Sequence, residues 1–312
     1  MPTGENSDHI SQERNSLFLL ANIFLNSFKI FLSTKKISVY IFTFLSFPLS
    51  FLLFLLSFLT FPLKIRIQHL EELSLFSPIH VESRHLLEEA NKEAKSLLFL
   101  KFLFFFPIFL LSFLTAVAAV NVAFSVLTNG NATVLPVLKT VWTRVLVTIT
   151  CVYATMLACT VAPGMLVAFF EARPFVRVVV AVLGSGLELH MMAVTSLALV
   201  ASVNEGVYGF DAIRVGSGLM EGKRACGWAL SGLFVLFSGF VRGAMEASMA
   251  AMDGSDFKRV ESTVVIGLLW DNVVWIFLYA FVVQWSFVVT TLFYFDLKKR
   301  DSIKSNSEIS LV

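Results

Sequence analysis

Long apolar runs separated by short polar segments dominate the sequence. A membrane-spanning helix needs about 20 consecutive, predominantly apolar residues. Six runs meet that requirement: Ile37–Leu63, Leu97–Leu127, Val145–Phe170, Phe175–Val203, Cys226–Ala251 and Val264–Phe295. The pattern therefore predicts an all-α membrane protein with six transmembrane helices.

Three amphipathic stretches precede the first, third and fifth runs, and each ends at or next to basic residues. They cover residues 17–34, 134–144 and 205–223. Such helices lie flat in the membrane interface. We therefore expect three hairpins of transmembrane helices, each preceded by an amphipathic interfacial helix.

The stretch 205–223 shows the amphipathic pattern most clearly. On a helical wheel its apolar stripe contains Tyr208, Ala212, Val215 and Leu219. Its polar side contains Asp211, Arg214, Gly218 and Glu221. A helix with these two faces buries one stripe and exposes the other.

The apolar composition supports a single membrane domain. Hydrophobic residues make up 57% of the chain and charged residues 15%, which is more apolar surface than a soluble globular domain of this size carries. We expect a disordered tail over residues 1–16, a six-helix membrane domain over 17–300, and a polar tail over 301–312.

The charge pattern bears on partners and on orientation. A net charge of +2 without basic and aromatic residues interleaved in a polar context argues against nucleic acid as a partner. Membrane lipids are the expected partners, with a second copy of the chain or another membrane protein as alternatives. Basic residues end the amphipathic stretches, and anionic lipid on the cytosolic face attracts them. We therefore expect both termini in the cytosol, at an endomembrane or the plasma membrane.

The segment Val203–Gly227, VNEGVYGFDAIRVGSGLMEGKRACG, carries a resemblance to known proteins. It resembles an uncharacterised family of plant multi-pass transmembrane proteins. More distantly, it is similar to the six-helix membrane domains attached to bacterial glycerophosphodiester phosphodiesterases. The resemblance implies membrane residence and the helix plan described above. It implies no activity, because the phosphodiesterase's catalytic domain has no counterpart in this chain.

Ionisable residues inside the apolar runs are the candidate functional residues, because a charge in the bilayer is costly. Glu188 lies in the fourth run, where it could pair with Arg242, bind a cation or relay a proton. The alternative is a buried, hydrogen-bonded or ion-paired residue that fixes helix packing.

The fifth and sixth runs add further charged candidates. Arg242 and Glu246 are four residues apart and could form a pair, either near a transport pathway or near a membrane end. Asp271 stands between Trp270 and Trp275, a position typical of the interfacial aromatic belt. The depth of these charges in the membrane decides between the alternatives.

Two further sets of residues are predicted to contact lipid and neighbouring helices. Lipid headgroups are expected to contact Arg214, Lys223 and Arg224. Small residues on one face of the fifth run predict close helix packing: Gly239, Gly243, Ala247 and Ala251.

Several common catalytic motifs are missing from the sequence. Five histidines cannot build the multi-histidine boxes of membrane di-iron enzymes, and there is no GxSxG or HExxH motif. The group His80, Glu82, His85, Glu88 and Glu89 matches no standard ligand spacing, so we expect no metal or cofactor. The sequence favours a non-enzymatic membrane component that organises lipid or a partner. The alternative is a small transporter or channel-like carrier that uses Glu188.

Overall fold

The computed structural model describes residues 20–76, 80–128, 134–169, 174–221, 223–250 and 262–309. Within these ranges the regular structure is helical and no strand occurs. Six helical segments are long and apolar enough to cross a membrane: Lys35–Ser74, Arg84–Leu127, Trp142–Val167, Phe175–Asn204, Arg224–Ala250 and Trp270–Ile303. The predicted all-α membrane class with six spanning helices is confirmed.

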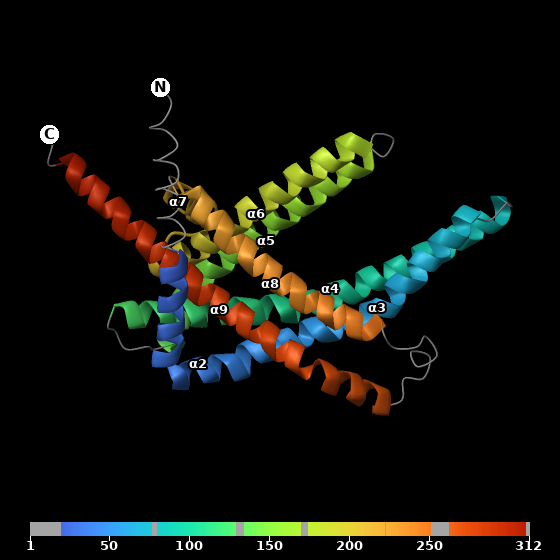
Figure 1. Cartoon of the computed structure of the whole chain (residues 1–312), viewed down its shortest axis with the longest axis horizontal. Coiled ribbons are helices and arrows are strands. Elements are labelled where there is room, and N and C mark those ends of the chain that lie inside the picture. The colour runs from blue at the N-terminus through green and yellow to red at the C-terminus, as the bar shows by residue number, and fades with distance from the viewer. Residues whose placement is uncertain are drawn as a thin grey trace, which may run out of the picture. The chain divides into compact units, whose positions relative to one another are not determined.

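Figure 1 shows the order of the helices along the chain. A first helix covers Leu20–Ser33. The others are α2 (Lys35–Ile41), a π-helix (Phe42–Ser46), α3 (Phe47–Phe76), α4 (His80–Leu127), α5 (Val134–Phe169), α6 (Pro174–Asn204), α7 (Phe210–Leu219), α8 (Arg224–Ala250) and α9 (Ser262–Ile309).

The chain divides into two compact units, where the sequence predicted one domain over 17–300. The first, which we call the elbow unit, comprises residues 1–41, 116–236 and 284–312. The second, the hairpin unit, comprises residues 42–115 and 237–283. Helices α4, α8 and α9 each contribute residues to both units, so hydrophobic length alone does not reveal the division.

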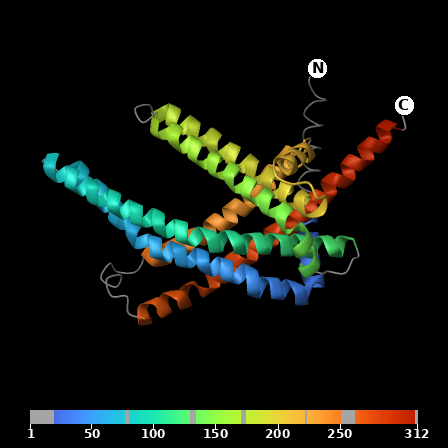
Figure 2. The same ribbon diagram turned by 180° about the vertical axis from the view of Figure 1, so that it is seen from behind.

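In the elbow unit, α5 and α6 lie side by side as a hairpin, as both views show (Figures 1 and 2). A glycine permits this approach, because a Cβ placed on Gly184 of α6 would lie 2.6 Å from the Cβ of Pro163 in α5. At the other end of the hairpin, the hydroxyl oxygens of Thr148 and Ser202 are 2.9 Å apart. Close packing and a buried hydrogen bond thus hold α5 to α6.

The first helix has an amphipathic sequence, and one of its faces packs against α9. The indole Nε1 of Trp285 in α9 donates a hydrogen bond to the Oγ of Ser27, at 3.0 Å. Ser27 is completely buried, and the ring of Phe24 packs edge-on against Trp285 with centroids 5.3 Å apart. One face of the predicted interfacial helix is therefore covered by α9.

Two predicted boundaries differ from the structure. The stretch 134–144 is the first part of α5 instead of a separate interfacial helix. Pro136 lies in the first turn of α5, where its missing N–H leaves the helix uninterrupted. The predicted tail 301–312 is helical as far as Ile309. An Arg300 to Asp296 ion pair of 3.0 Å, four residues apart, supports that extension.

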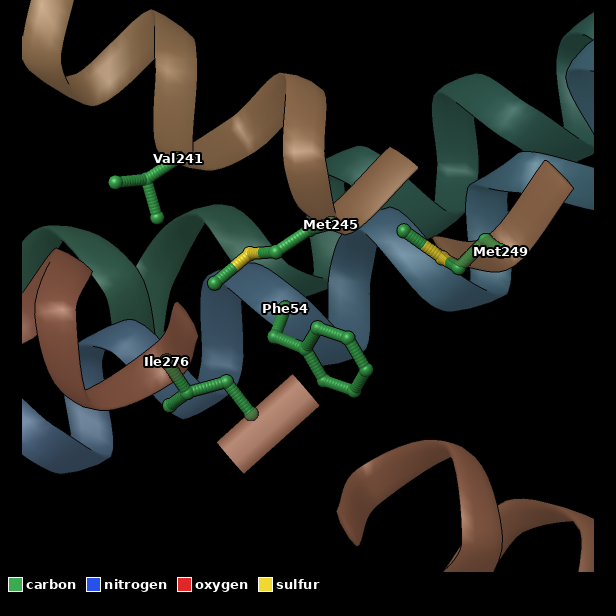
Figure 3. Close-up of a cluster of buried hydrophobic side chains, with 5 residues drawn as sticks. All are labelled: Phe54, Val241, Met245, Met249 and Ile276. Carbon is green, nitrogen blue, oxygen red and sulfur yellow. The ribbon is translucent and has the colours of Figure 1, made fainter. Parts of the chain in front are cut away.

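In the hairpin unit, α3 and α4 form the hairpin and α8 and α9 pack against α3. The polar ends of the hairpin are joined by Arg66 of α3, whose guanidinium lies 3.0 Å from both Glu89 and Glu93 of α4. A cluster of buried side chains forms the core: Phe54 from α3, Val241, Met245 and Met249 from α8, and Ile276 from α9 (Figure 3).

Candidate functional site

A cavity of about 260 Å³ lies among the helices of the hairpin unit. Its lining comes from α3 (Ser50, Leu53, Phe54, Leu56, Ser57, Thr60, Lys64), α4 (Lys101), α8 (Arg242, Met245) and α9 (Tyr279). One part of the lining is apolar and another is basic. Phe54 and Met245 belong both to the lining of the cavity and to the buried core cluster.

Helix α3 presents a row of polar side chains to this cavity. Ser50, Ser57, Thr60 and Lys64 follow one another at spacings of seven, three and four residues, which places them on one helix face. The Ser50 hydroxyl donates to the backbone carbonyl of Ile276 in α9, at 2.9 Å. The Thr60 hydroxyl donates to the carbonyl of Leu56, at 2.8 Å. Both hydroxyl protons therefore already form hydrogen bonds within the protein.

Three cationic side chains meet at the cavity, each from a different helix. They are Lys64, Lys101 and Arg242. Lys64 has a distant partner, since its Nζ lies 3.9 Å from an Oε of Glu246. Over the residues that the structure describes, no ion pair is formed by Lys101 or Arg242. The cavity therefore carries an excess of positive charge, and an anion is the chemistry that would relieve it.

The helix surface around Lys101 is strongly apolar. Phe102 is 76% exposed, and Leu98, Phe99 and Phe106 are similarly uncovered. In a membrane-spanning segment such a surface faces acyl chains. A second hollow is lined by Lys92 and Lys95 of α4 together with apolar side chains from α3 and α4. The basic cavity thus lies beside a surface suited to lipid.

Of the predicted site residues, Arg242 lies at the cavity and Glu246 beside it. Glu246 forms its ion pair with Lys64 of α3, whereas the spacing in α8 suggested Arg242 as its partner. An i, i+4 spacing permits such a pair on a helix but does not exclude a partner from a neighbouring helix. Asp271 is exposed and is not among the residues that line the cavity.

Glu188 lies elsewhere, in the part of α6 that belongs to the elbow unit. It is half-buried, next to the exposed Leu187. In the described ranges it has no ion-pair partner. Arg242 belongs to the other unit, so the suggested pairing of these two residues stays a prediction.

Three of the four small residues predicted to pack against a helix lie on an exposed face of α8, so their role in packing stays a prediction. Gly239, Gly243 and Ala247 are exposed, and a Cβ on either glycine would meet nothing within 4 Å. Ala251 lies outside the described residues. An exposed glycine face can accept a helix but does not by itself recruit one. Close helix packing occurs at Gly184 and at a glycine of α7.

That glycine is Gly216, which brings the backbone of α7 against α6. A Cβ on Gly216 would lie 2.6 Å from the carbonyl oxygen of Val194 and 3.0 Å from the amide nitrogen of Ala198. Ala212, one turn earlier, is completely buried, as the predicted apolar stripe requires. Tyr208 departs from that stripe, because it precedes α7 and is 56% exposed. Gly206 and Gly209, with φ of 71° and 66°, turn the chain ahead of α7.

The connection between α6 and α7 carries a compact polar cluster. The carboxylate of Glu205 accepts hydrogen bonds from the hydroxyl of Tyr294 and from the Nζ of Lys298, the latter at 2.7 Å. Burial raises the pKa of the Glu205 carboxyl, but the two hydrogen bonds and the charge of Lys298 outweigh burial. The pKa of Glu205 therefore lies below its ordinary value, and the carboxylate is ionised at neutral pH.

The three residues predicted to touch lipid headgroups lie around α7. Arg214 and Arg224 are exposed, and Lys223 is partly exposed. Their contact with lipid stays a prediction. Among the described residues, no group of three or more His, Cys, Asp or Glu side chains could hold a metal ion.

A family model for a domain of unknown function (DUF8558) matches residues 9–304, nearly the entire chain. The chain belongs to the DUF8558 family. No curated protein and no solved structure matches it. The DUF8558 match thus covers the whole membrane region but assigns no ligand and no activity to it.

Sequence reasoning missed two of the three cavity cations, Lys64 and Lys101. In both cases the sequence contains a feature that distinguishes the lysine from its surroundings. Lys64 ends the row of hydroxyl residues on α3, and Lys101 interrupts an otherwise apolar run. Neither feature shows that α3, α4 and α8 bring these side chains to one cavity, because the packing of separate helices decides which faces meet.

Proposed function

We propose that this protein is a non-enzymatic, multi-pass membrane component that holds an anionic lipid in the basic cavity of the hairpin unit. The observation that carries the proposal is the meeting of Lys64, Lys101 and Arg242 at one partly apolar cavity. Uncompensated cations in membrane-spanning segments are costly and usually find a partner. Here the partner would come from the membrane.

The shape and lining of the cavity favour an amphiphile over a purely polar ion. Leu53, Phe54 and Met245 provide an apolar part of the lining. The volume of about 260 Å³ is slightly below the roughly 300–1,000 Å³ of pockets for drug-sized ligands. It accommodates a headgroup and the first part of the acyl chains, while the remainder of the chains would lie along the exposed apolar surface of α4.

The elbow unit would contribute a second contact with anionic lipid. The exposure of Arg214 and Arg224 supports headgroup contact there, and basic interfacial segments favour the anionic cytosolic leaflet. We therefore propose cytosolic termini and an endomembrane or the plasma membrane as the location. The resemblance to plant membrane proteins and to the membrane domains of bacterial phosphodiesterases agrees with membrane residence and adds no catalytic role.

Lipid retention tests the proposal directly. The full chain is released from nanodiscs of phosphatidylcholine containing about one tenth anionic lipid, and the lipid that stays bound is recorded by native mass spectrometry. The expected result is one retained anionic lipid per chain and at least a tenfold loss of retention in the double variant Lys101→Gln, Arg242→Gln.

The matched control is Arg84→Gln, which removes one exposed positive charge from α4 away from the cavity lining. This control should retain lipid as the wild type does. Unchanged retention in the double variant would refute the proposed function. Equal loss in Arg84→Gln would show attraction by overall charge instead of by the cavity.

The alternative function, a small transporter or channel-like carrier, depends on Glu188. Glu188 is half-buried and has no ion-pair partner in the described residues. These two features agree with a transport role but do not favour it. Flux measured in proteoliposomes that persists in Glu188→Gln would rule out this residue as the transport site.

A further inference from the structure

We propose that the cavity recognises a phosphomonoester lipid, whose terminal phosphate carries close to two negative charges, in preference to phosphodiester lipids with one. This inference rests on the proposed function and names the ligand class more narrowly. It follows from the charge balance of the cavity, the number of available donors, and the space beside them.

The charges around the cavity leave a surplus of two. Lys64, Lys101 and Arg242 are positive. In the part of the chain that the structure describes, Glu246 is the one acidic residue that forms an ion pair with any of them, at 3.9 Å from Lys64. A phosphate monoester has a second pKa of about 6 and carries roughly −1.5 to −2 at pH 7. A phosphodiester carries one negative charge and would leave one cation uncompensated. Charge neutrality at a membrane-embedded site therefore favours the monoester.

The donors at the cavity match a phosphate with three free oxygens. Lys64 and Lys101 each offer ammonium protons, and Arg242 offers a planar fork. The Ser50 and Thr60 protons already bond to backbone carbonyls, so the cations are the principal donors. Because they come from three helices, they can approach three oxygens from different directions. A diester has two free oxygens and needs space for a substituent on each side.

The limited space favours compact headgroups. A cavity of about 260 Å³ suits a phosphate and part of the glycerol backbone better than a headgroup that adds a sugar or a second charged group. The apolar wall of Leu53 and Phe54 has no role for an inorganic anion, whereas it suits the start of an acyl chain. A lipid is therefore the source of the phosphate that we infer.

The test compares lipids of equal chain length in nanodiscs of phosphatidylcholine. Phosphatidic acid serves as the monoester, and phosphatidylglycerol and phosphatidylserine serve as diesters, each at the same fraction. Native mass spectrometry of the full chain should show at least tenfold higher retention of phosphatidic acid. Inorganic phosphate and glycerol 3-phosphate, added at millimolar concentration, should not displace it.

Variants of one lysine sharpen the test. Lys64→Gln lowers the surplus charge to one and should reduce the monoester preference to less than threefold, while anionic lipid is still retained. Lys64→Arg keeps the charge and should keep the preference. Glu246→Gln raises the surplus charge and frees Lys64, so retention of phosphatidic acid should increase.

The outcomes separate this inference from the proposed function. Equal retention of phosphatidic acid and the diesters overturns the inference and leaves an anionic-lipid cavity. Displacement by soluble phosphate overturns the lipid as the source of the anion. Retention of no anionic lipid overturns both proposals. An unchanged monoester preference in Lys64→Gln would contradict the charge argument.

Discussion

The polar clusters of the two units differ in how their charges are compensated. In the elbow unit, Glu205 is bonded by both Tyr294 and Lys298, so its charge is neutralised within the protein. In the hairpin unit, three cations line one cavity. Among the described residues, their one ion pair joins Lys64 to Glu246, which is not part of the lining, at 3.9 Å. A cluster whose charges are compensated within the protein holds helices together, whereas a cluster with excess charge can bind a ligand of opposite charge. The two units should therefore respond differently to mutation and to lipid.

The largest expected effect concerns the packing of the elbow. Gly216→Leu places side-chain atoms where the carbonyl of Val194 lies, 2.6 Å from the added Cβ. Because backbone cannot move aside cheaply, we expect a loss of about 3 kcal/mol in unfolding free energy, measured by thermal or denaturant unfolding in detergent.

The matched control is Gly218→Ala on the same helix, where a Cβ meets nothing within 4 Å. It should be neutral or stabilise by up to about 1 kcal/mol, because alanine favours helix over glycine. Equal stability of Gly216→Leu and wild type would mean that α7 does not depend on its contact with α6.

The elbow charge cluster should matter for stability and not for lipid. Lys298→Gln removes the ammonium that bonds Glu205, and we expect a loss of about 1 kcal/mol, because the pair is partly exposed to solvent. Lipid retention should equal that of the wild type. Loss of lipid without loss of stability would reverse the roles that we assign to the two units.

The same cluster makes stability depend on acidity. The pKa of Glu205 is lowered in the folded protein, so its contribution is present above the ordinary pKa of 4.5 and disappears as pH falls through the lowered value. The stability difference between wild type and Glu205→Gln, measured between pH 7 and pH 3, should shrink toward low pH. A difference that stays constant would contradict this origin.

The smallest effect is expected for the cavity in the absence of lipid. Arg242→Gln removes one of three like charges, so delipidated protein should be unchanged or more stable by up to about 0.5 kcal/mol. In anionic nanodiscs the order should reverse, since the wild type alone gains stability from bound lipid. A variant less stable than wild type without lipid would indicate a structural role for Arg242.

The helix plan was accessible from the sequence, whereas several contacts were not. Ala212 was correctly expected on the buried stripe of α7, because a local helical period decides which residues share a face. Tyr208 was misplaced, since the turn formed by Gly206 and Gly209 ends that period before it reaches the helix. Glu246 forms its ion pair with Lys64 of α3, a neighbour that the sequence of α8 alone does not reveal.

By itself, the sequence determined the membrane class, the six spanning segments and the amphipathic character of α7, because these depend on local hydrophobic length and period. Tertiary structure alone decided the division into two units, the glycine contact of α7 with α6, and the meeting of Lys64, Lys101 and Arg242. The physical reason is that each of these features depends on how separate helices pack against one another. No local pattern specifies which faces of those helices meet.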